Sequence, residues 1–249
     1  MDLAGGCMPL IIVRHGQSQG NHDNRFCGWI DIPLTDTGRQ QAANAADMMK
    51  QADLIPDVLF TSKLTRSIDS GDIIIRRLDR LWVDHYKCWK LNERHYGQWQ
   101  GRNKKEVCEE VGVANYDYVR RNYHGCPPLV AEGEDPSIDQ RYQGVTDLPR
   151  GESLEMAMGR MIPYYHDNIV PYLKQNKTVL VVTHGSMVRS FIKYFAQVSD
   201  DHISEINVAN AVPLVVKFAD DTFSKGDYYY LDPELAREGA ARIRDEGKA

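Results

Sequence analysis

The sequence predicts an α/β fold: a three-layer, doubly wound and mostly parallel sheet with helices on both faces. Two short apolar runs support this prediction, LIIV at residues 10–13 and TVLVV at residues 178–182. Both are rich in β-branched residues, as are strands that are buried on both faces of a parallel sheet. Each run leads into a His-Gly pair and then into a helical pattern, so His15 and His184 should follow the carboxyl ends of parallel strands. Ligands bind at that edge of an open α/β sheet.

The elements of the first third alternate between helix and strand. A polar loop extends to Pro33, and Thr35 is a suitable N-cap for a helix that continues to about Gln51. Further along we expect a strand, a helix and a weaker strand, at residues 58–61, 64–78 and 81–86.

A polar, aromatic and basic segment, residues 92–150, then interrupts this alternation. It predicts an inserted lid or subdomain with short helices near residues 104–111 and 116–122, separated by loops at its prolines and glycines. Afterwards the alternation resumes. The expected elements are a helix from Ser153 to Leu173 in which Pro163 either causes a kink or lies near the start, a strand and a helix around His184, a strand at residues 213–218 and a helix after Asp232-Pro233.

We therefore expect one domain over residues 1–249, with an insert at about 92–150 and a C-terminal tail at about 232–249. The tail is rich in charge, and Leu235 and Ile243 are its main large apolar residues. Such a segment has little apolar surface with which to dock tightly, so we expect a loosely held lid that ends in mobile residues 247–249.

Composition excludes several classes of function. A net charge of −5 and a pI of about 5.9 argue against nucleic acid or an acidic membrane surface as the main partner. There is no secretion signal and no apolar run that approaches a membrane span, which predicts a cytoplasmic protein. The 5 cysteines have no CxxC spacing, so we expect reduced thiols. HExxH and GxxxxGK[ST] are absent, and we predict no metal.

The residues that follow three of the predicted strands indicate phosphoryl chemistry. Arg14 and His15 follow the first strand, Arg66 lies shortly after the second and His184 follows a later one. Guanidinium groups match phosphate oxygens, and a neutral imidazole can attack phosphorus as a nucleophile. The neighbouring cations should lower the pKa of His15 and keep it neutral near pH 7.

Five segments resemble the cofactor-dependent phosphoglycerate mutases of the histidine phosphatase superfamily, and the resemblance runs from about Pro9 to the last residues. The Gly-Trp-x-Asp-x-Pro-Leu-Thr stretch and LNERHYG are the most specific to the mutase branch. The segments are LIIVRHG (10–16), RFCGWIDIPLTDTGRQQA (25–42), LNERHYG (91–97), VRRNY (119–123) and VTHGSMVR (182–189).

The resemblance implies a role for each matching residue. His15 is the implied phosphorylated nucleophile, with Arg14, Arg66 and His184 around the transferred group, and Glu93 is the implied general acid and base. The implied substrate-binding residues are Ser18, Asn21, Cys27, Gly28, Arg94, Tyr96, Lys104, Arg120, Arg121, Gly185 and Ser186. The implied reaction interconverts 3-phosphoglycerate and 2-phosphoglycerate, in glycolysis and gluconeogenesis, with 2,3-bisphosphoglycerate as primer and no metal. The family is often dimeric or tetrameric, so a homodimer or homotetramer is in keeping with it.

Three positions depart from the family pattern. Cys27 stands where Ser or Thr is usual, Gly20 where Trp is common and Ser186 where Asn is common. Two alternative enzymes use the same nucleophile: a phosphomonoesterase, and a bisphosphoglycerate synthase, against which Ser18 argues because the synthase branch tends to carry Gly there. A non-catalytic binding protein on this fold would be expected to lack one of His15, Arg66, Glu93 or His184.

Overall fold

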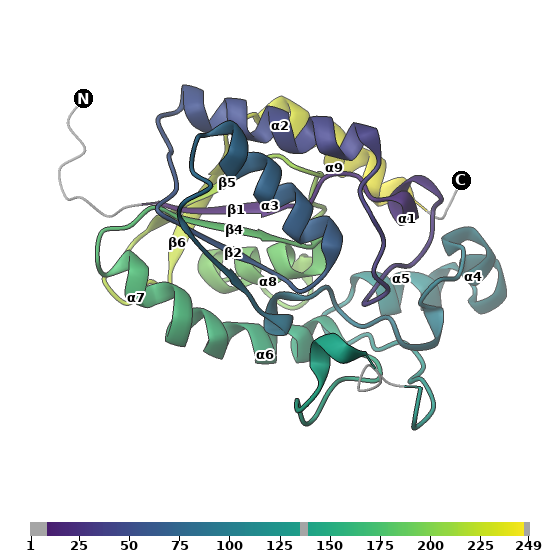
Figure 1. Ribbon diagram of the computed structural model, residues 1–249. Coiled ribbons are helices and arrows are strands. Elements are labelled where there is room, and N and C mark those ends of the chain that lie inside the picture. The colour runs from purple at the N-terminus through teal and green to yellow at the C-terminus, as the bar shows by residue number, and fades with distance from the viewer. Residues whose placement is uncertain (1–8, 135–138, 247–249) are drawn as a thin grey trace.

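The computed structural model describes residues 9–134 and 139–246. Within these ranges, one six-stranded sheet has the order β3-β2-β4-β1-β5-β6 (Figure 1). Its strands are β1 (Leu10–Arg14), β2 (Val58–Thr61), β3 (Asp84–Lys87), β4 (Val179–Thr183), β5 (Leu214–Phe218) and β6 (Gly226–Tyr230). Strands β3, β2, β4 and β1 pair in parallel, whereas β5 and β6 pair antiparallel at one edge. The predicted mostly parallel sheet is confirmed.

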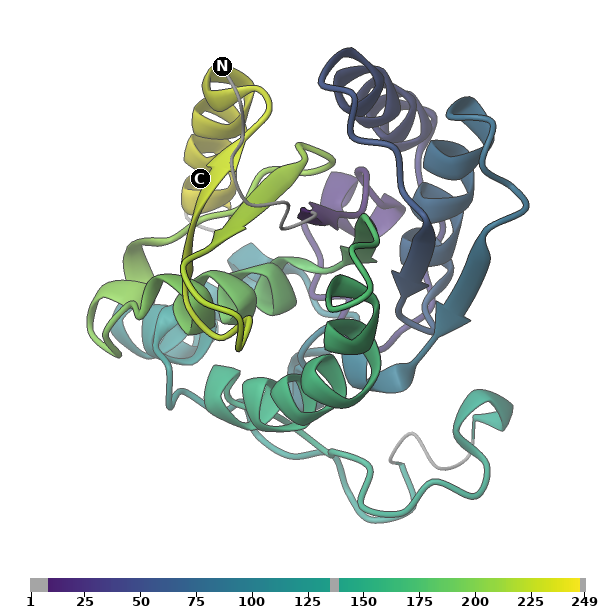
Figure 2. The ribbon, with the colours of Figure 1, turned by 90° about the vertical axis from the view of Figure 1, so that its left-hand side faces the viewer.

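Two helical layers cover the sheet, as Figures 1 and 2 show. Helices α2 (Asp36–Gln51) and α3 (Thr65–Arg77) pack on one face, against alternate strand residues such as Ile11 and Leu59. Helices α6 (Leu154–Tyr164) and α8 (Gly185–Ala196) pack on the other face, against Ile12 and Phe60. Because both faces are covered, the central strands are buried along their whole length, which accounts for their uninterrupted apolar sequences.

The helix starts that the sequence predicts are confirmed at the level of single hydrogen bonds. The side chains of Thr35, Ser153 and Asp232 each accept from a backbone amide in the first turn of α2, α6 and α9 (Pro233–Asp245). Each bond satisfies an amide that has no partner inside the helix.

The helix predicted from Ser153 to Leu173 consists of three consecutive helical segments rather than one helix with a single kink. Helix α6 continues through Pro163 and passes into a π-helical turn, η5 (Tyr165–Ile169), before α7 (Val170–Leu173). The second proline, Pro171, explains the wide turn: it has no N–H for the carbonyl four residues earlier, and its ring needs room beside that carbonyl.

The insert lies beyond the carboxyl ends of the parallel strands, on the right of Figure 1. It contains α4 (Lys104–Val111) and α5 (Val113–Arg121), which pack with Phe26 and Trp99 in a separate apolar cluster. Short helical turns η1 (Trp89–Leu91), η2 (Gly97–Trp99) and η4 (Gln140–Tyr142) connect the rest, and η6 (His202–Glu205) follows α8. The predicted helix at 116–122 therefore starts three residues earlier.

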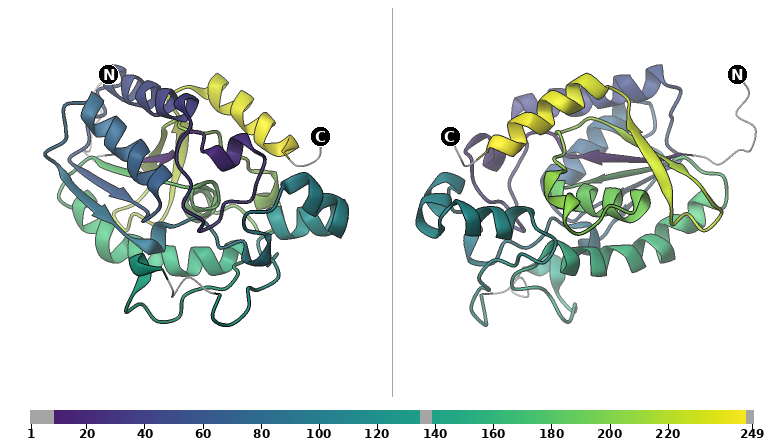
Figure 3. Two further views of the ribbon diagram at one scale, coloured as in Figure 1. Left: turned by 45° about the vertical axis from the view of Figure 1, so that its right-hand side comes forward. Right: turned by 180° about the vertical axis from the view of Figure 1, so that it is seen from behind.

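The C-terminal tail is a helix that is held by contacts between small residues. In α9, Ala236 is buried against the cluster of Ala209 and Val212, and a Cβ on Gly239 would lie 2.5 Å from the Cβ of Ala209. Figure 3 shows the end of α9 approaching the insert. Small side chains allow this close contact without large apolar residues, and the expectation of a loosely held tail stays a prediction. Residues 247–249 lie outside the described part of the chain.

Two elements escape the sequence prediction. The loop that follows β1 contains a short helix, α1 (Gln19–His22), and the chain after β5 returns as β6. Strand β6 alternates between half-buried and exposed residues in the sequence GDYYY, so it lacks the apolar run that marks a central strand. The weakly predicted strand at 81–86 is shifted to β3, which lies at the opposite edge and is largely exposed.

Candidate active site

The two histidines lie side by side because their strands are neighbours. Strands β1 and β4 pair in parallel with Arg14 opposite Thr183, so the residues that follow, His15 and His184, leave the sheet at the same edge. Their ring centroids are 5.0 Å apart. Both side chains are buried.

The ring of His15 is oriented by the backbone of its neighbour. Its Nδ1 lies 2.6 Å from the carbonyl oxygen of Gly16, so the neutral ring carries its proton on Nδ1 and donates it to that carbonyl. The lone pair is then on Nε2. Burial, followed by the charges of Arg66 and Arg14, holds the pKa of His15 well below its ordinary value of 6.5. This imidazole is therefore neutral at pH 7, and a neutral imidazole can act as a nucleophile.

His184 is oriented by a serine that the sequence did not identify. Its Nε2 lies 2.8 Å from the hydroxyl of Ser62, which also accepts a hydrogen bond from the amide of Leu64. Burial and then Arg66 hold the pKa of His184 well below 6.5. Its Nδ1 is buried and has no hydrogen-bond partner among the described residues. Ser62 follows β2 directly, and this position at a strand end was the signal available in the sequence.

Two arginines complete this end of the cavity, and backbone carbonyls hold both. Arg14 donates to the carbonyl of Val208 (2.6 Å), and Arg66 donates to the carbonyls of Gly28 (2.7 Å) and Ile30 (3.0 Å). Within the described ranges, the Nε of each arginine is buried without a partner. Both guanidiniums are therefore fixed in place while each keeps a donor for an anion. We call Arg14, His15, Arg66 and His184 the histidine end.

Glu93 lies between the histidine end and the insert, and backbone amides position its carboxylate. Oε1 accepts from the amide of Arg94 (2.8 Å) and from that of Ser186 (3.2 Å) in the first turn of α8. The backbone carbonyl of Glu93 accepts from the indole of Trp29 (2.6 Å) and from Arg160 (3.1 Å). The carboxylate is thus directed into the cavity while its backbone is anchored behind it.

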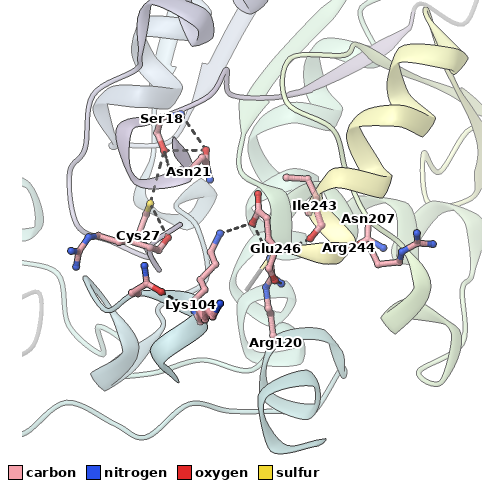
Figure 4. Close-up of polar contacts among 12 residues, drawn as sticks. Ser18, Asn21, Cys27, Lys104, Arg120, Asn207, Ile243, Arg244 and Glu246 are labelled. Carbon is pink, nitrogen blue, oxygen red and sulfur yellow. Dashed lines mark hydrogen bonds and ion pairs between the residues drawn. The ribbon is translucent and has the colours of Figure 1, made fainter. Parts of the chain in front are cut away.

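The other end of the cavity is formed by Lys104, Arg120 and Arg121 of the insert, which we call the cationic end. Most of its partners come from the C-terminal segment, and Arg121 also donates to the side chain of Asn207 (Figure 4). Lys104 and Arg120 donate to the carboxylate of Glu246 at 2.5 and 2.9 Å, and Arg121 donates to the carbonyl of Ile243 at 2.8 Å. Burial lowers the pKa of Lys104, and burial with the nearby Arg120 lowers that of Arg121 to about 10.

Most residues that the resemblance implied for the site do line one cavity of about 80 Å³, which has room for several water molecules. They are Arg14, His15, Asn21, Cys27, Gly28, Arg66, Glu93, Tyr96, Lys104, Arg120, Arg121, Gly185 and Ser186. His184 lies next to His15 and is fully buried.

Two predicted substrate-binding residues lie outside the lining of that cavity. Ser18 is buried as the N-cap of α1, where its hydroxyl accepts from the amide of Asn21. Arg94 donates to the carbonyls of Val119 and Gly125 at 2.9 and 3.1 Å. Both side chains hold backbone segments that carry other site residues, so their positions favour support over direct contact with a ligand.

Sequence reasoning missed several lining residues, which are Arg25, Phe26, Arg189, Asn207, Val208, Ile243 and Glu246. Arg189 had a usable signal, because it lies one helical turn after Gly185 on the same face of α8. It donates to the carbonyl of Arg121 at 2.6 Å, and burial with the charge of Arg121 lowers its pKa to about 9. Glu246 had no such signal.

The departures at Gly20 and Cys27 are coupled by contact. A Cβ on Gly20 would lie 2.3 Å from the sulfur of Cys27, so a side chain at position 20 and this thiol cannot share the space. Figure 4 shows the sulfur of Cys27 directed toward Ser18, whose hydroxyl lies 3.9 Å away. At the third departure, Ser186 contributes its backbone amide to Glu93, and every residue type except proline supplies that group.

Two other kinds of feature are absent from the described parts of the chain. No helix there is long and apolar enough to cross a membrane. Nor do three or more His, Cys, Asp or Glu side chains gather there in a way that could hold a metal ion.

Comparison with known proteins places the chain among enzymes that act on phosphate esters. Its sequence matches the Histidine phosphatase superfamily (branch 1) over residues 10–137 and 128–228. It is 39% identical over 246 residues to Phosphoglycerate mutase 1 of Saccharomyces cerevisiae, which covers 97% of this chain and 100% of the yeast protein. It is also 39% identical to the 2,3-bisphosphoglycerate-dependent phosphoglycerate mutase of Corynebacterium kroppenstedtii, over 96% of this chain and 97% of that protein.

Solved structures share the fold at lower sequence identity. A mycobacterial glucosyl-3-phosphoglycerate phosphatase has a TM-score of 0.68 and 19% identity, covering 90% of this chain and 97% of its own. Bacillus stearothermophilus YhfR has a TM-score of 0.68 and 20% identity, covering 90% and 96%. These likenesses confirm the three-layer α/β architecture.

Proposed function

The chain belongs to branch 1 of the histidine phosphatase superfamily, and on this premise we propose that it is a phosphoglycerate mutase that interconverts 3-phosphoglycerate and 2-phosphoglycerate. The reaction proceeds through a phosphohistidine at His15. We place the enzyme in the cytoplasm, in glycolysis and gluconeogenesis.

One observation carries the proposal. A neutral, oriented histidine lies beside fixed guanidiniums, and a carboxylate and several cationic groups line the same cavity. The Nδ1 proton of His15 is engaged by Gly16, which leaves Nε2 to attack phosphorus. The unpartnered Nε atoms of Arg14 and Arg66 supply donors for the phosphoryl oxygens. Donors that are fixed before the reaction stabilise the charge of the transition state without a cost of reorganisation.

His184 contributes from the side of the phosphoryl group. Its unpartnered Nδ1 becomes a hydrogen-bond donor when the Ser62 hydroxyl donates to Nε2, because a neutral imidazole carries only one proton. Because its pKa is low, the ring does not take up a second proton and adds no positive charge to a site that already holds two arginines. His184 then acts as a neutral donor to the transferred group.

Glu93 is the general acid and base in this proposal. The transfer to His15 requires that the departing substrate oxygen gain a proton, and the reverse transfer requires that the attacking hydroxyl lose one. A carboxylate performs both steps when it is within reach of that oxygen. Glu93 lines the same cavity as His15, and the amides of Arg94 and Ser186 fix its position.

The cavity fits a molecule with two anionic ends, as 2,3-bisphosphoglycerate is. The histidine end has buried donors without partners, and the cationic end offers Lys104, Arg120 and Arg121. When bound, this primer would supply the phosphoryl group that charges His15. Charged donors recognise phosphate and carboxylate oxygens through short, strong hydrogen bonds. The cationic end has no evident use in a general phosphomonoesterase, and this favours the mutase.

An assay coupled to enolase, with 3-phosphoglycerate as substrate, tests the proposal. We expect 2-phosphoglycerate to form, slowly without 2,3-bisphosphoglycerate and much faster with it, and we expect activity to persist in excess chelator. Release of inorganic phosphate without any 2-phosphoglycerate would replace the mutase with a phosphatase. Loss of activity in chelator with recovery on adding manganese would contradict the metal-independent mechanism.

A further inference from the structure

Glu246 occupies the place where a second anionic group of the substrate would lie. Its carboxylate accepts hydrogen bonds from Lys104 (2.5 Å) and Arg120 (2.9 Å), and all three side chains are largely buried. Its backbone carbonyl accepts from Arg120 (2.6 Å) and from the hydroxyl of Tyr116 (3.3 Å). In Figure 4 the side chains of Lys104 and Glu246 point toward one another across the cavity.

These bonds use donors that a substrate anion would also need. Lys104 and Arg120 are close enough to bind one carboxylate oxygen together, so an incoming carboxylate or phosphate must take the place of Glu246 or pair less closely with them. Burial alone would raise the pKa of Glu246, but the charges of Lys104 and Arg120 outweigh it and lower the pKa below its ordinary value. The group is therefore an anion in the empty site.

Helix α9 also makes contacts that do not involve Glu246. Asp232 caps the start of the helix by accepting from the amide of Leu235, and Ala236 packs against Ala209. Gly239 continues this close contact one turn later. Release of Glu246 therefore requires a movement of the last turn only, while these contacts are kept.

We propose that Glu246 is an internal anion that holds the cationic end in the empty enzyme and competes with the substrate for Lys104 and Arg120. The proposal rests on the proposed function in naming phosphoglycerates as the competing ligands. It has two consequences. The buried cations are never left unpaired between turnovers, and every substrate binds in exchange for Glu246.

The exchange predicts a gain in affinity when Glu246 is neutralised. Suppose that Glu246 is bound to Lys104 and Arg120 in about nine tenths of the empty enzyme molecules. An anion that needs the same two side chains then binds with an apparent affinity that is about tenfold weaker than its intrinsic affinity. Glu246→Gln keeps the size of the side chain and removes its charge, and Glu246→Ala removes the group. The matched control is Glu238→Gln, which makes the same change of charge on an exposed residue of the same helix.

The experiment is calorimetric titration of the full-length chain with inorganic sulfate. This probe does not depend on the identity of the substrate. We expect sulfate at the cationic end to bind about tenfold more tightly in both Glu246 variants than in the wild type and in Glu238→Gln, whereas sulfate at the histidine end should bind equally in all four proteins. Adding Lys104→Gln to Glu246→Gln should abolish the gain, which assigns it to the cationic end. Circular dichroism confirms that each variant is folded.

The kinetic counterpart is a lower KM for 3-phosphoglycerate in Glu246→Gln. A sulfate affinity that is unchanged or weaker in both folded variants would overturn the proposal and make Glu246 a clamp that assists binding. The two proposals fail separately. Tighter sulfate binding in the Glu246 variants without mutase activity in the wild type would contradict the proposed function and support the competing role of Glu246. Mutase activity with unchanged sulfate binding would support the proposed function and contradict the role of Glu246.

Discussion

The two ends of the cavity differ in what already binds their cations. At the histidine end, Arg14 and Arg66 are held by backbone carbonyls and keep an unpartnered buried Nε. At the cationic end, the same kind of side chain is paired with the carboxylate of Glu246 and with carbonyls at the end of α9. The histidine end is ready for its anion, whereas the cationic end must exchange one anion for another. Rigid chemistry and exchangeable binding are thus placed on different elements, the sheet edge and the insert.

The largest effect that separates the two ends should come from Glu93, which serves the chemistry without contributing positive charge. Glu93→Gln keeps an acceptor for the amides of Arg94 and Ser186 but removes the group that moves the proton. We expect turnover to fall by about 10²–10⁴-fold with little change in KM. The coupled enolase assay measures both constants, and the exposed Glu109→Gln serves as control. A fall confined to KM would assign Glu93 to binding.

A smaller effect, and one on binding, is expected at the cationic end. Lys104→Gln removes a charged hydrogen bond to an anion, which contributes about 1.5–3 kcal/mol or about 10–100-fold in binding. Because the variant also loses the bond from Lys104 to Glu246, up to about tenfold of this loss is recovered, and KM should rise by up to about tenfold. Formation of phosphohistidine at saturating 2,3-bisphosphoglycerate should be retained. The neighbouring Lys105→Gln, at an exposed position, should leave KM unchanged. An equal loss of kcat would show that chemistry and binding are not separated between the histidine end and the cationic end.

Ser62 tests whether the histidine end depends on exact orientation. Ser62→Ala removes the hydrogen bond to Nε2 of His184, and a bond of about 1 kcal/mol corresponds to a loss of about fivefold in kcat. Ser199→Ala is a matched control, because Ser199 makes a hydrogen bond of 2.7 Å to His202 on the surface. Unchanged kcat in the folded Ser62 variant would mean that packing alone orients His184.

The smallest effect should be that of mild acid. An unperturbed histidine of pKa 6.5 would be about three-quarters protonated at pH 6. Burial and the two arginines lower the pKa of His15 and His184 well below that value, so both rings stay neutral there. We expect kcat at pH 6 to remain close to its value at pH 7.5, with the loss appearing only in stronger acid. A half-maximal rate near pH 6.5 that tracks His15 would contradict the depressed pKa.

A feature of the structure can be predicted from the sequence when the contacts that determine it join residues that are close together in the chain. His15 and His184 were predictable because a buried strand, a turn and a helix follow one another in sequence, and adjacent parallel strands bring their ends together. The caps at Thr35 and Asp232 were predictable for the same reason. Each of these depends on a few consecutive residues.

The parts that the sequence did not predict depend on contacts between distant segments. Glu246 and Lys104 are 142 residues apart, and nothing in a charged C-terminal helix indicates which carboxylate turns into the cavity. Arg94 has the residue type and motif of a ligand-binding group, but its guanidinium is used by carbonyls of α5 and the loop after it. Strand β6 was missed because an edge strand with one exposed face has no continuous apolar run.

In the proposed mechanism, His15 carries the phosphoryl group. Incubation with 2,3-bisphosphoglycerate, followed by peptide mapping, tests it most directly, with His15→Ala and the exposed His202→Ala as the matched pair. We expect an acid-labile, base-stable phosphoryl group on the His15 peptide of the wild type and His202→Ala, and none in His15→Ala. A phosphoryl group on Ser18 or Cys27, or one that persists in His15→Ala, would contradict it.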